Sequence, residues 1–450
     1  MAVDLPREIA LKILYDINEK GAYSNIAINK YLAANDLKSI DRAFVTELVY
    51  GTVKWKLAID WVIMYFSSVR RKKISPWILN VLRLGVYQLI YMSRVPESAA
   101  CNESVNLAKK YGHQAAAGFV NAIIRNIASN RNNICYPDRG ADIVQYLSVK
   151  YSHQEWMVQK FIRLFGEEFT ESLLAANNET PSFIVRANTL KVSVEQLAES
   201  LAAEGVESFR GRYADDAIII KNPSAITRLE AFNKGFFQVQ DESSMLVVQA
   251  LDPKSGELII DACSAPGGKA THIAQLMHNK GTILARDVHE HKIKLINDAV
   301  ARLGLDIIKT EIYDAALPDT KYAKKADRVL LDAPCTGLGI IRKKPDIKWT
   351  RDIDTSEITK LQLKLINTVS SCVKPGGILV YSTCTITPEE NQDIIRSFLD
   401  TNSEFQMSDI SGYLPKELGK YIEDKGMIQL YPNRDGTDGF FIARLERVDS

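Results

Sequence analysis

Features that would direct this chain to a membrane or an export pathway are missing from its 450 residues. No apolar stretch approaches the roughly 18 residues that a membrane-spanning helix needs. The first residues, Met1–Glu8, carry charges where a signal peptide would be apolar. We therefore expect a cytoplasmic protein without a membrane partner.

An excess of charge of either sign is also missing. The 56 Lys and Arg residues nearly balance the 55 Asp and Glu residues, so the net charge at pH 7 is +1. Any polyanion would therefore have to be bound by local basic runs. One such run contains Arg342, Lys343 and Lys344. We interpret these three residues as candidate RNA contacts, and an ordinary solvated surface is the alternative.

Cysteines are few, and none of the six lies in a CxxC spacing: Cys101, Cys135, Cys263, Cys335, Cys372 and Cys384. In a long chain without a signal peptide, this usage indicates free thiols and excludes a disulfide framework or a zinc site. His289 and His291 flank Glu290, but no third ligand is evident. We expect no metal.

Length and composition predict a multidomain soluble protein, with 46% hydrophobic and 25% charged residues. Residues 1–140 show helical periodicity without strand patterns, which predicts an all-α domain. Residues 141–237 predict a helical linker followed by a small α+β region. Residues 238–450 alternate strands and helices, which is typical of a Rossmann-like α/β domain with a parallel sheet.

The small α+β region has strand patterns at 183–190, 217–220 and 235–239, with a helix at 194–203 that Ser193 is placed to cap. Arg186 and Asn188 are two residues apart on the first strand, so they share one face of the sheet. Lys191 lies just past the strand end. We interpret Arg186, Asn188 and Lys191 as a candidate RNA-contacting surface, with a solvated sheet face as the alternative.

A glycine-rich string, Asp261-Ala-Cys-Ser-Ala-Pro-Gly-Gly-Lys269, follows the first strand of the α/β region and leads into a helix. Its glycines permit close backbone approach to a ligand, and a helix N-terminus favours a polar or anionic group. The spacing fits neither a phosphate loop nor the dinucleotide GxGxxG. We predict a cofactor turn formed by Cys263, Ser264, Ala265, Pro266, Gly267, Gly268 and Lys269.

Aspartates follow the next two strands. Asp287 lies about 20 residues beyond the glycine-rich turn, where an acidic residue can bind ribose hydroxyls. Asp314 is placed to reach an adenine edge. Either could instead cap a helix. A nucleoside-containing cofactor without a pyrophosphate loop fits S-adenosylmethionine better than NAD.

Two cysteines follow two later strands, in Asp332-Ala-Pro-Cys335 and Ser382-Thr-Cys384. Since ligands bind at the carboxyl ends of parallel strands, both motifs and the cofactor turn should meet in one crevice. A thiolate that adds to carbon 6 of cytosine makes carbon 5 nucleophilic enough to accept a methyl group. Asp332 suits a contact with N3. Spacing alone does not decide which cysteine is the nucleophile.

These three strings resemble the signature motifs of the RNA 5-methylcytosine methyltransferases of the Nop2/Sun family. The resemblance implies that Cys384 is the nucleophile, that Cys335 assists elimination, and that Cys263–Lys269, Asp287, Asp314 and Asp332 bind S-adenosylmethionine. Arg186-Ala-Asn188 and Gln240–Ser244 also resemble family strings.

The helical N-terminal part resembles a NusB-type RNA-binding domain. The resemblance rests on Asp41–Gly51, Leu82–Leu89 and Gly118–Arg125. Together with the catalytic strings it implies methylation of 16S rRNA, at cytosine 967, by a monomer. Methylation of tRNA and a non-catalytic role in ribosome assembly are the alternatives.

Overall fold

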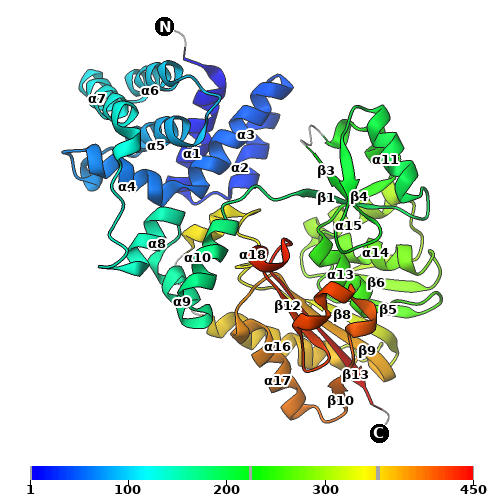
Figure 1. The fold of residues 1–450 in the computed structure, drawn as a ribbon. Helices are drawn as coiled ribbons and strands as arrows, with labels where there is room; N and C mark the ends of the chain where they lie inside the picture. The colour runs from blue at the N-terminus through cyan, green and yellow to red at the C-terminus, as the bar shows by residue number, and fades with distance from the viewer. Residues whose placement is uncertain (1–2, 222–225, 351–354, 449–450) are drawn as a thin grey trace. The chain divides into compact units, whose positions relative to one another are not determined.

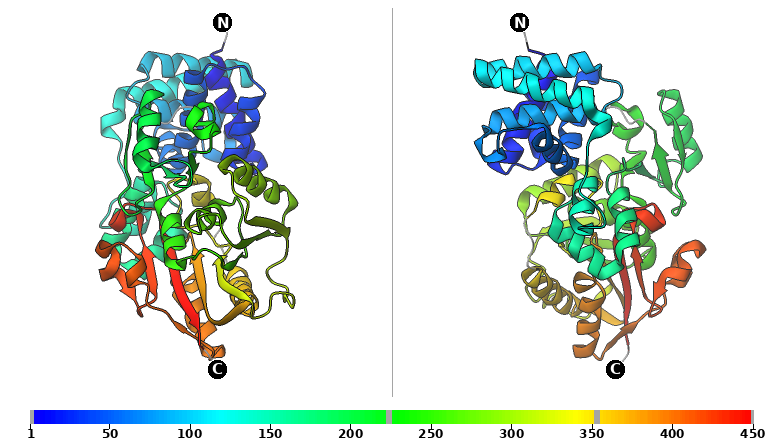
Figure 2. Two further views of the ribbon diagram at one scale, coloured as in Figure 1. Left: turned by 90° about the vertical axis from the view of Figure 1, so that its right-hand side faces the viewer. Right: turned by 60° about the vertical axis from the view of Figure 1, so that its left-hand side comes forward.

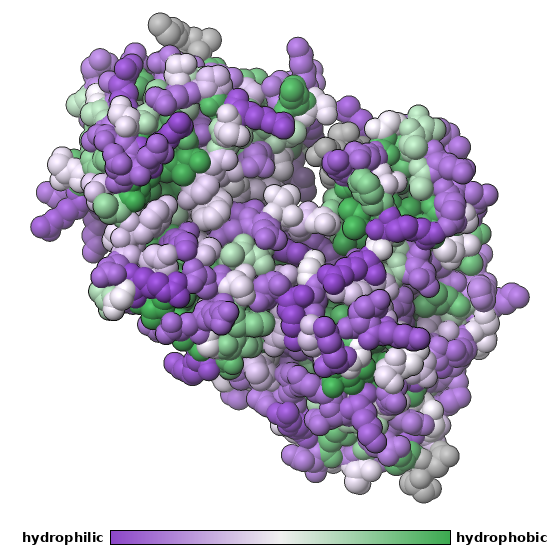
Figure 3. Space-filling model, in the orientation of Figure 1, coloured by the Kyte–Doolittle hydropathy of each residue, from purple (hydrophilic) through white to green (hydrophobic). Residues whose placement is uncertain are grey.

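The computed structural model describes residues 3–221, 226–350 and 355–448, and its contacts divide the chain into two compact units. One unit comprises Met1–Glu179 and Lys343–Asp352, and the other comprises Thr180–Arg342 and Ile353–Ser450. Figure 1 shows the elements of both. None of the helices in the described ranges is long and apolar enough to cross a bilayer. On the face drawn in Figure 3, hydrophilic side chains predominate and apolar ones are scattered.

The first unit is helical, and both views in Figure 2 show only helices in its blue-to-cyan part. Asp4 caps the first helix by accepting from the Arg7 N–H, and Gly21 ends it in the left-handed conformation. The central helix, α5, buries most of its length among its neighbours. The helices are α1 Leu5–Lys20, α2 Ser24–Ala33, α3 Ser39–Lys54, α4 Lys56–Phe66, η1 Arg71–Lys73, α5 Pro76–Tyr91, α6 Glu97–Tyr111, α7 Gln114–Asn130, η2 Arg131–Asn133, α8 Ile143–Tyr151, α9 Glu155–Phe165 and α10 Glu167–Ala176.

A short segment from late in the sequence, with the 3-10 helix η4 Pro345–Trp349, completes this helical unit. The Lys348 ammonium is buried and donates to the Lys54 carbonyl and to Asn178 Oδ1, at 3.1 and 2.5 Å. Burial lowers the pKa of Lys348 well below its ordinary value. The Trp349 indole donates to the Val53 carbonyl at 2.8 Å. These contacts bind the segment to α3 and to the end of α10.

The second unit begins with a four-stranded antiparallel sheet in the order β2-β3-β1-β4. Ser193 and Gln196 form a reciprocal capping box at its helix, which begins where the sequence predicted. The short edge strand β2 was not predicted. The elements are β1 Phe183–Ala187, α11 Val194–Ala203, β2 Ser208–Arg210, β3 Ala217–Ile220, η3 Ile226–Arg228, α12 Glu230–Asn233 and β4 Phe237–Val239.

The larger sheet has the order β11-β12-β13-β9-β8-β5-β6-β7, with β10 paired to β13. Helices α13, α14 and α15 cover one face, and α16 and α17 cover the other (Figure 1). The elements are α13 Glu242–Leu251, β5 Leu258–Asp261, α14 Gly268–Leu276, β6 Thr282–Asp287, α15 Glu290–Leu303, β7 Ile308–Ile312, β8 Ala326–Asp332, α16 Ser356–Ser370, β9 Val373–Thr383, η5 Pro388–Glu390, α17 Gln392–Thr401, β10 Phe405–Met407, η6 Ser411–Tyr413, η7 Lys416–Tyr421, β11 Ile422–Glu423, β12 Met427–Leu430, α18 Pro432–Asp435 and β13 Phe440–Arg447.

Strands β5 to β9 are parallel, which confirms the predicted Rossmann-like fold class. The sheet edge differs from the prediction, because β13 runs antiparallel to β9 and pairs with a hairpin strand. The chain winds outward through β6 and β7 on one side of β5, and through β8 and β9 on the other. The strand order therefore reverses between β5 and β8, which is where such sheets open a ligand crevice.

Candidate active site

A pocket of about 420 Å³ lies at the carboxyl ends of the parallel strands, beside the switch point between β5 and β8. It brings together the side chains that the sequence predicted from three separate strings. Its lining includes Cys263, Ala265, Asp287, Asp314, Asp332, Pro334, Cys335 and Cys384. Apolar Val288, Leu361 and Leu365 line it as well. One cavity thus holds three thiols, three carboxylates and an apolar wall.

The glycine-rich turn connects β5 to α14 and forms one side of this region. Gly267 has a φ of 96° and its N–H donates to the Ser264 carbonyl at 2.7 Å, so the turn needs a residue without a side chain there. The Ser264 N–H donates to the Arg286 carbonyl on β6 at 2.8 Å. The turn is thereby tied to the neighbouring strand, with the N-terminus of α14 beginning at Gly268.

Arg186 is a buried residue that hydrogen-bonds to the backbone where this turn meets α14. Its side chain is 1% exposed and its guanidinium donates to the Gly268 carbonyl, to Gln240 and to Thr271 Oγ1. Asn188 is also buried, donating to the Gly235 and Leu303 carbonyls. The predicted RNA contact by these two side chains is therefore corrected, because both faces of β1 are covered by the rest of the unit.

Lys191 is exposed, and its ammonium donates to the Lys234 and Arg302 carbonyls at 2.9 and 3.2 Å. Arg342 is buried, and its Nε donates to Asp438 at 2.7 Å, so the predicted RNA contact at this position is also corrected. Lys343 is half-buried and Lys344 is exposed, both in the segment that belongs to the helical unit. Contacts of Lys191, Lys343 and Lys344 with RNA stay predictions.

Arg186→Met should test the structural role of this arginine. Removing a buried guanidinium leaves its carbonyl and amide partners without a donor, so we expect unfolding free energy to fall by about 3 kcal/mol in urea titrations. The exposed Lys191→Met is the matched control and should leave stability nearly unchanged. Unchanged stability of Arg186→Met together with weaker RNA binding would restore the surface interpretation.

Asp261, the last residue of β5, is a feature of the site that the predicted residue set omitted. It is fully buried, and neither carboxylate oxygen has a well-formed hydrogen bond in the described residues, although the Ser264 side chain lies near enough to lower its pKa. Burial raises the pKa of Asp261 to about 7. A buried acid left unpaired beside a ligand crevice is suited to a cationic group of the ligand. The signal in the sequence was its position at a strand end.

Asp287 and Asp314 lie on the same pocket wall, from the ends of β6 and β7. Asp287 Oδ1 accepts from the His289 N–H at 3.1 Å and lies 3.5 Å from Lys292 Nζ. Asp314 is exposed and accepts from the Ala316 N–H at 2.9 Å. Each carboxylate keeps acceptor capacity toward the pocket. The described residues contain no group of three or more metal-ligating side chains arranged to hold a metal ion.

Asp332 stands between the cofactor turn and the cysteines. Its Oδ2 accepts from Lys269 Nζ and its Oδ1 accepts from the Ser382 hydroxyl, both at 2.7 Å. The β8–β9 register pairs Asp332 with Ser382, which places the two motifs side by side. The carboxylate is therefore fixed in orientation and still reaches the pocket.

The two cysteines come from adjacent parallel strands and lie with their Sγ atoms 3.3 Å apart. The hydrogen bond with Cys384, and then burial, raise the pKa of Cys335 well above its ordinary value. The Sγ–Sγ distance allows one thiol of the pair to donate a hydrogen bond to the other. The Cys384 carbonyl accepts from the Gly339 N–H at 3.0 Å, and a side chain on Gly339 would collide with the Gly439 carbonyl.

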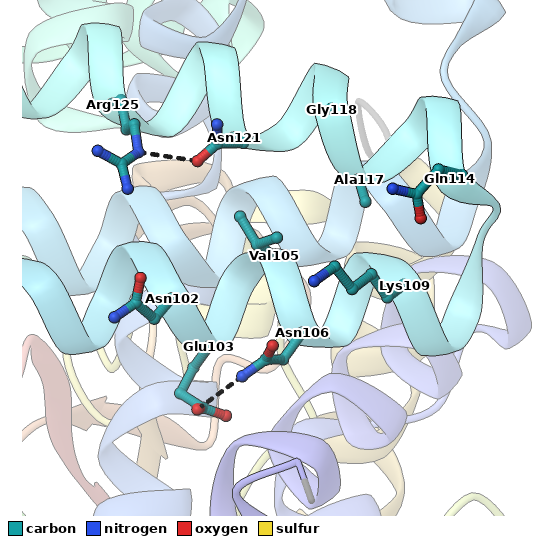
Figure 4. Close-up of a pocket in the computed structure, with 10 residues that line it drawn as sticks. All are labelled: Asn102, Glu103, Val105, Asn106, Lys109, Gln114, Ala117, Gly118, Asn121 and Arg125. Atoms are coloured by element: carbon teal, nitrogen blue, oxygen red, sulfur yellow. Dashed lines mark hydrogen bonds between the residues drawn. The ribbon is translucent and has the colours of Figure 1, made fainter. Parts of the chain in front are cut away.

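A second hollow, of about 550 Å³, lies between α6 and α7 of the helical unit (Figure 4). Its polar lining consists mainly of amides, with Lys109 on one helix and Arg125 on the other. Arg125 is held by Asn121 at 2.8 Å, and Glu103 accepts from Asn106 at 3.1 Å (Figure 4). Its lining has no thiol and one carboxylate, so the chemistry belongs to the pocket with the cysteines.

Comparisons with known proteins agree with this geometry. A model of the 16S rRNA methyltransferase RsmB/F family matches residues 248–446, a NusB family model matches 4–129, and an RsmF/B-like ferredoxin-like domain matches 153–227. A probable ribosomal RNA small subunit methyltransferase B from Bacillus subtilis (strain 168) is 40% identical, over 98% of both chains. The chain belongs to the RsmB family. A probable methyltransferase B from Synechocystis sp. PCC 6803 is 36% identical, over 98% of this chain and 99% of the relative.

Two solved structures resemble this chain over most or nearly all of its length. The crystal structure of PH0851 has a TM-score of 0.80 and 30% identity, covering 99% of this chain and all of that one. NSun6 from Pyrococcus horikoshii, solved with the S-adenosylmethionine analogue SFG, has a TM-score of 0.57 and 25% identity, covering 66% of this chain and 99% of that one. S-adenosylmethionine is the cofactor of this methyltransferase family. The residues at the pocket can therefore be compared with the parts of this molecule.

The residues present fit S-adenosylmethionine. The unpaired Asp261 carboxylate suits the ammonium of its methionine part, and the N-terminus of α14 suits the carboxylate of that part. Asp287 and Asp314 offer acceptors for ribose hydroxyls and an adenine amine, beside the apolar Val288. When bound, the cofactor supplies an electrophilic methyl group.

The raised pKa of Asp261 predicts a pH dependence of cofactor binding. The protonated form of Asp261 is favoured in the free protein. Its contribution to the free energy of unfolding is therefore fully present below its ordinary pKa and is lost as pH rises through about 7. A cationic ligand favours the ionised form, so S-adenosylmethionine affinity should fall roughly tenfold between pH 7.5 and 6 in calorimetric titrations. Asp261→Asn should bind more weakly and without this pH dependence. A wild-type affinity that is flat over that range would contradict the assignment.

Proposed function

We propose that this RsmB-family chain methylates carbon 5 of a cytosine in 16S rRNA, through a covalent adduct between Cys384 and carbon 6 of the base. Family resemblance selects cytosine 967 as the target. The observation that carries the proposal is the pair of thiols 3.3 Å apart in the pocket that also holds Asp332 and the cofactor turn. Two thiols beside one carboxylate can supply a nucleophile for carbon 6, a contact with N3 and a helper for release of the product.

The Cys384 thiolate starts the reaction by adding to carbon 6, and the hydrogen bond from the Cys335 S–H stabilises that thiolate. Asp332, oriented by Lys269 and Ser382, accepts a hydrogen bond from a protonated N3. The carboxylate thereby stabilises the positive charge of the protonated ring and favours addition of the thiolate to carbon 6. The cofactor, when bound, would supply the methyl group that carbon 5 takes, and the bond from that group to the cofactor sulfur would break. A water molecule then removes the carbon 5 proton, the freed electron pair re-forms the double bond between carbons 5 and 6, and the bond between carbon 6 and Cys384 breaks. The Cys335 thiol gives a proton to the departing sulfur and regains one from solvent.

Access to carbon 6 requires an unstacked base. The target cytosine therefore lies in a single-stranded segment or is turned out of its helix into the pocket. The apolar Leu361 and Leu365 on α16 offer the pocket wall against which a base can stack. Lys191, Lys343 and Lys344 are proposed contacts of the RNA backbone.

The proposal is tested by transfer of labelled methyl groups from S-adenosylmethionine into purified 16S rRNA and bulk tRNA, mapped to the base. Label at carbon 5 of one 16S cytosine is the expected result. Label only in tRNA would keep the chemistry and replace the substrate. Label on a ring atom other than carbon 5, or no label in either RNA, would overturn the mechanism.

A further inference from the structure

Glu390 is a buried carboxylate that contacts the turns carrying Cys335 and Cys384. The reaction steps above assign it no role. It ends the 3-10 helix η5 and has no exposed surface. A carboxylate removed from water is unfavourable unless hydrogen bonds satisfy its oxygens. Glu390 meets this condition fully, since each of its oxygens accepts at least two hydrogen bonds.

The donors come from both cysteine-bearing turns. Thr336, the residue after Cys335, donates its N–H at 2.9 Å and its hydroxyl at 2.5 Å. Thr385, the residue after Cys384, donates its hydroxyl at 3.2 Å, and Thr387 donates at 3.0 Å. One carboxylate therefore binds the residue next to each thiol.

Further contacts close the same network. Gln362 on α16 donates to Glu390 at 3.1 Å and to the Pro334 carbonyl at 2.9 Å, so it holds the Cys335 turn from its other side. The hydroxyls of Thr336 and Thr385 lie 2.9 Å apart, so either of them can donate to the other in place of Glu390. Asn391, the next residue after Glu390, donates to the Thr385 carbonyl at 3.2 Å.

We propose that Glu390 is a positioning residue of the methyltransferase, which fixes the Cys335 and Cys384 turns to each other so that both thiols face the same base. This inference rests on the proposed function for its consequence, whereas the arrangement of the thiols can be measured without RNA. The strands alone do not fix it, because both cysteines lie beyond the last paired residues of β8 and β9. Thiols that drift apart lose the hydrogen bond that holds the thiolate on Cys384.

The charge of Glu390 acts in the same direction as its hydrogen bonds. The groups that raise the pKa of Cys335 are, besides burial, Cys384 first and then the carboxylates of Glu390 and Asp332. Lys269 faces Asp332 at 2.7 Å and offsets part of that field. Glu390 therefore helps to keep Cys335 protonated, as a donor to the departing Cys384 sulfur.

Glu390→Gln is the decisive variant, because glutamine keeps the shape and loses the charge. Its carbonyl can accept from the Thr336 N–H, and its amide can donate to the threonine hydroxyls, which also accept. We expect a folded protein with unchanged S-adenosylmethionine affinity and RNA KM, and with kcat for methyl transfer at least tenfold lower. Glu404→Gln, at the opposite end of the sheet and 3.7 Å from Arg447, is the matched control and should keep the wild-type kcat.

A second measurement follows the Cys335 thiol without RNA. In a Cys384→Ser background, the pH profile of Cys335 alkylation, read by peptide mass spectrometry, should shift to lower pH by about half a unit or more when Glu390→Gln is added. A merely structural role would not move this profile. If Glu390→Gln does not fold, Thr336→Val is the alternative, because it removes one hydroxyl hydrogen bond and keeps the carboxylate. This variant should lower kcat without shifting the pH profile of Cys335 alkylation.

An unchanged kcat together with an unchanged alkylation profile in Glu390→Gln would overturn the role of Glu390. A wild-type protein that methylates a different atom would overturn the proposed function instead, and the alkylation profile would still decide the role of Glu390. The two failures are thus distinguishable.

Discussion

Cys384→Ser should abolish methyl transfer while leaving S-adenosylmethionine binding intact. A serine hydroxyl is ionised far less readily than a thiol, so the variant can form neither a nucleophile at neutral pH nor the adduct at carbon 6. We expect the single-turnover rate with saturating RNA to fall by at least about 10³-fold. Cofactor affinity should stay at the wild-type value, because serine keeps nearly the size of cysteine at this part of the pocket lining.

Cys135→Ser is the matched control for that substitution. Cys135 is an exposed thiol of the helical unit, so its replacement should change neither the methyl-transfer rate nor the stability. Full turnover by Cys384→Ser would reject Cys384 as the nucleophile. If Cys335→Ser were inactive at the same time, the roles of the two cysteines would be exchanged.

Much of the fold follows from local patterns. The capping box at Ser193 marks the start of α11, and apolar runs ahead of Asp261, Asp287 and Asp332 mark the ends of β5, β6 and β8. The convergence of these strand ends is a property of parallel sheets, so the pocket could be expected before its side chains were placed. The apolar run at 439–445 also predicts the last strand, β13, but not its antiparallel direction. Strands β10, β11 and β12 could not be predicted in this way, because each has only two to four residues.

The errors at Arg186 and Asn188 have a common physical cause. Alternation along β1 shows which residues share a face, but not whether that face is solvated. Both faces of this small sheet are covered, one by α11 and α12 and the other by packing around Met245 on α13. Polar residues at such positions are buried and paired, which a pattern of residue types does not distinguish from a surface.

Glu390 and Asp261 illustrate a different limit of the sequence. The role of Glu390 depends on its hydrogen bonds with Thr336, Gln362 and Thr385. These side chains lie far apart in the sequence and come together only in the folded chain. Asp261 stands out because it is fully buried and has no well-formed hydrogen bond within the described part of the chain. The spacing of residues in the sequence does not show which hydrogen bonds a buried carboxylate makes. Both residues were therefore identified only from the folded chain.

Cys335→Ser should trap the reaction after methyl transfer. The Cys335 thiol has a raised pKa and lies 3.3 Å from Cys384, so it is held protonated within reach of the departing sulfur. A serine hydroxyl can donate a hydrogen bond but releases its proton far less readily, so elimination should slow while addition and methylation continue. We expect a covalent protein–RNA species that survives denaturation, is destroyed by ribonuclease, and carries the labelled methyl group.

Further variants separate proton transfer from hydrogen bonding in that step. Cys335→Ala removes both, so it should accumulate as much adduct as Cys335→Ser if proton transfer is the required contribution, and clearly more if the hydrogen bond alone is enough. The double variant Cys335→Ser/Cys384→Ser should form no adduct, because it lacks the attacking sulfur. Wild-type turnover by Cys335→Ser without any denaturation-resistant species would show that the Cys384 sulfur leaves unaided, and the proximity of the two thiols would then serve only to hold the thiolate on Cys384.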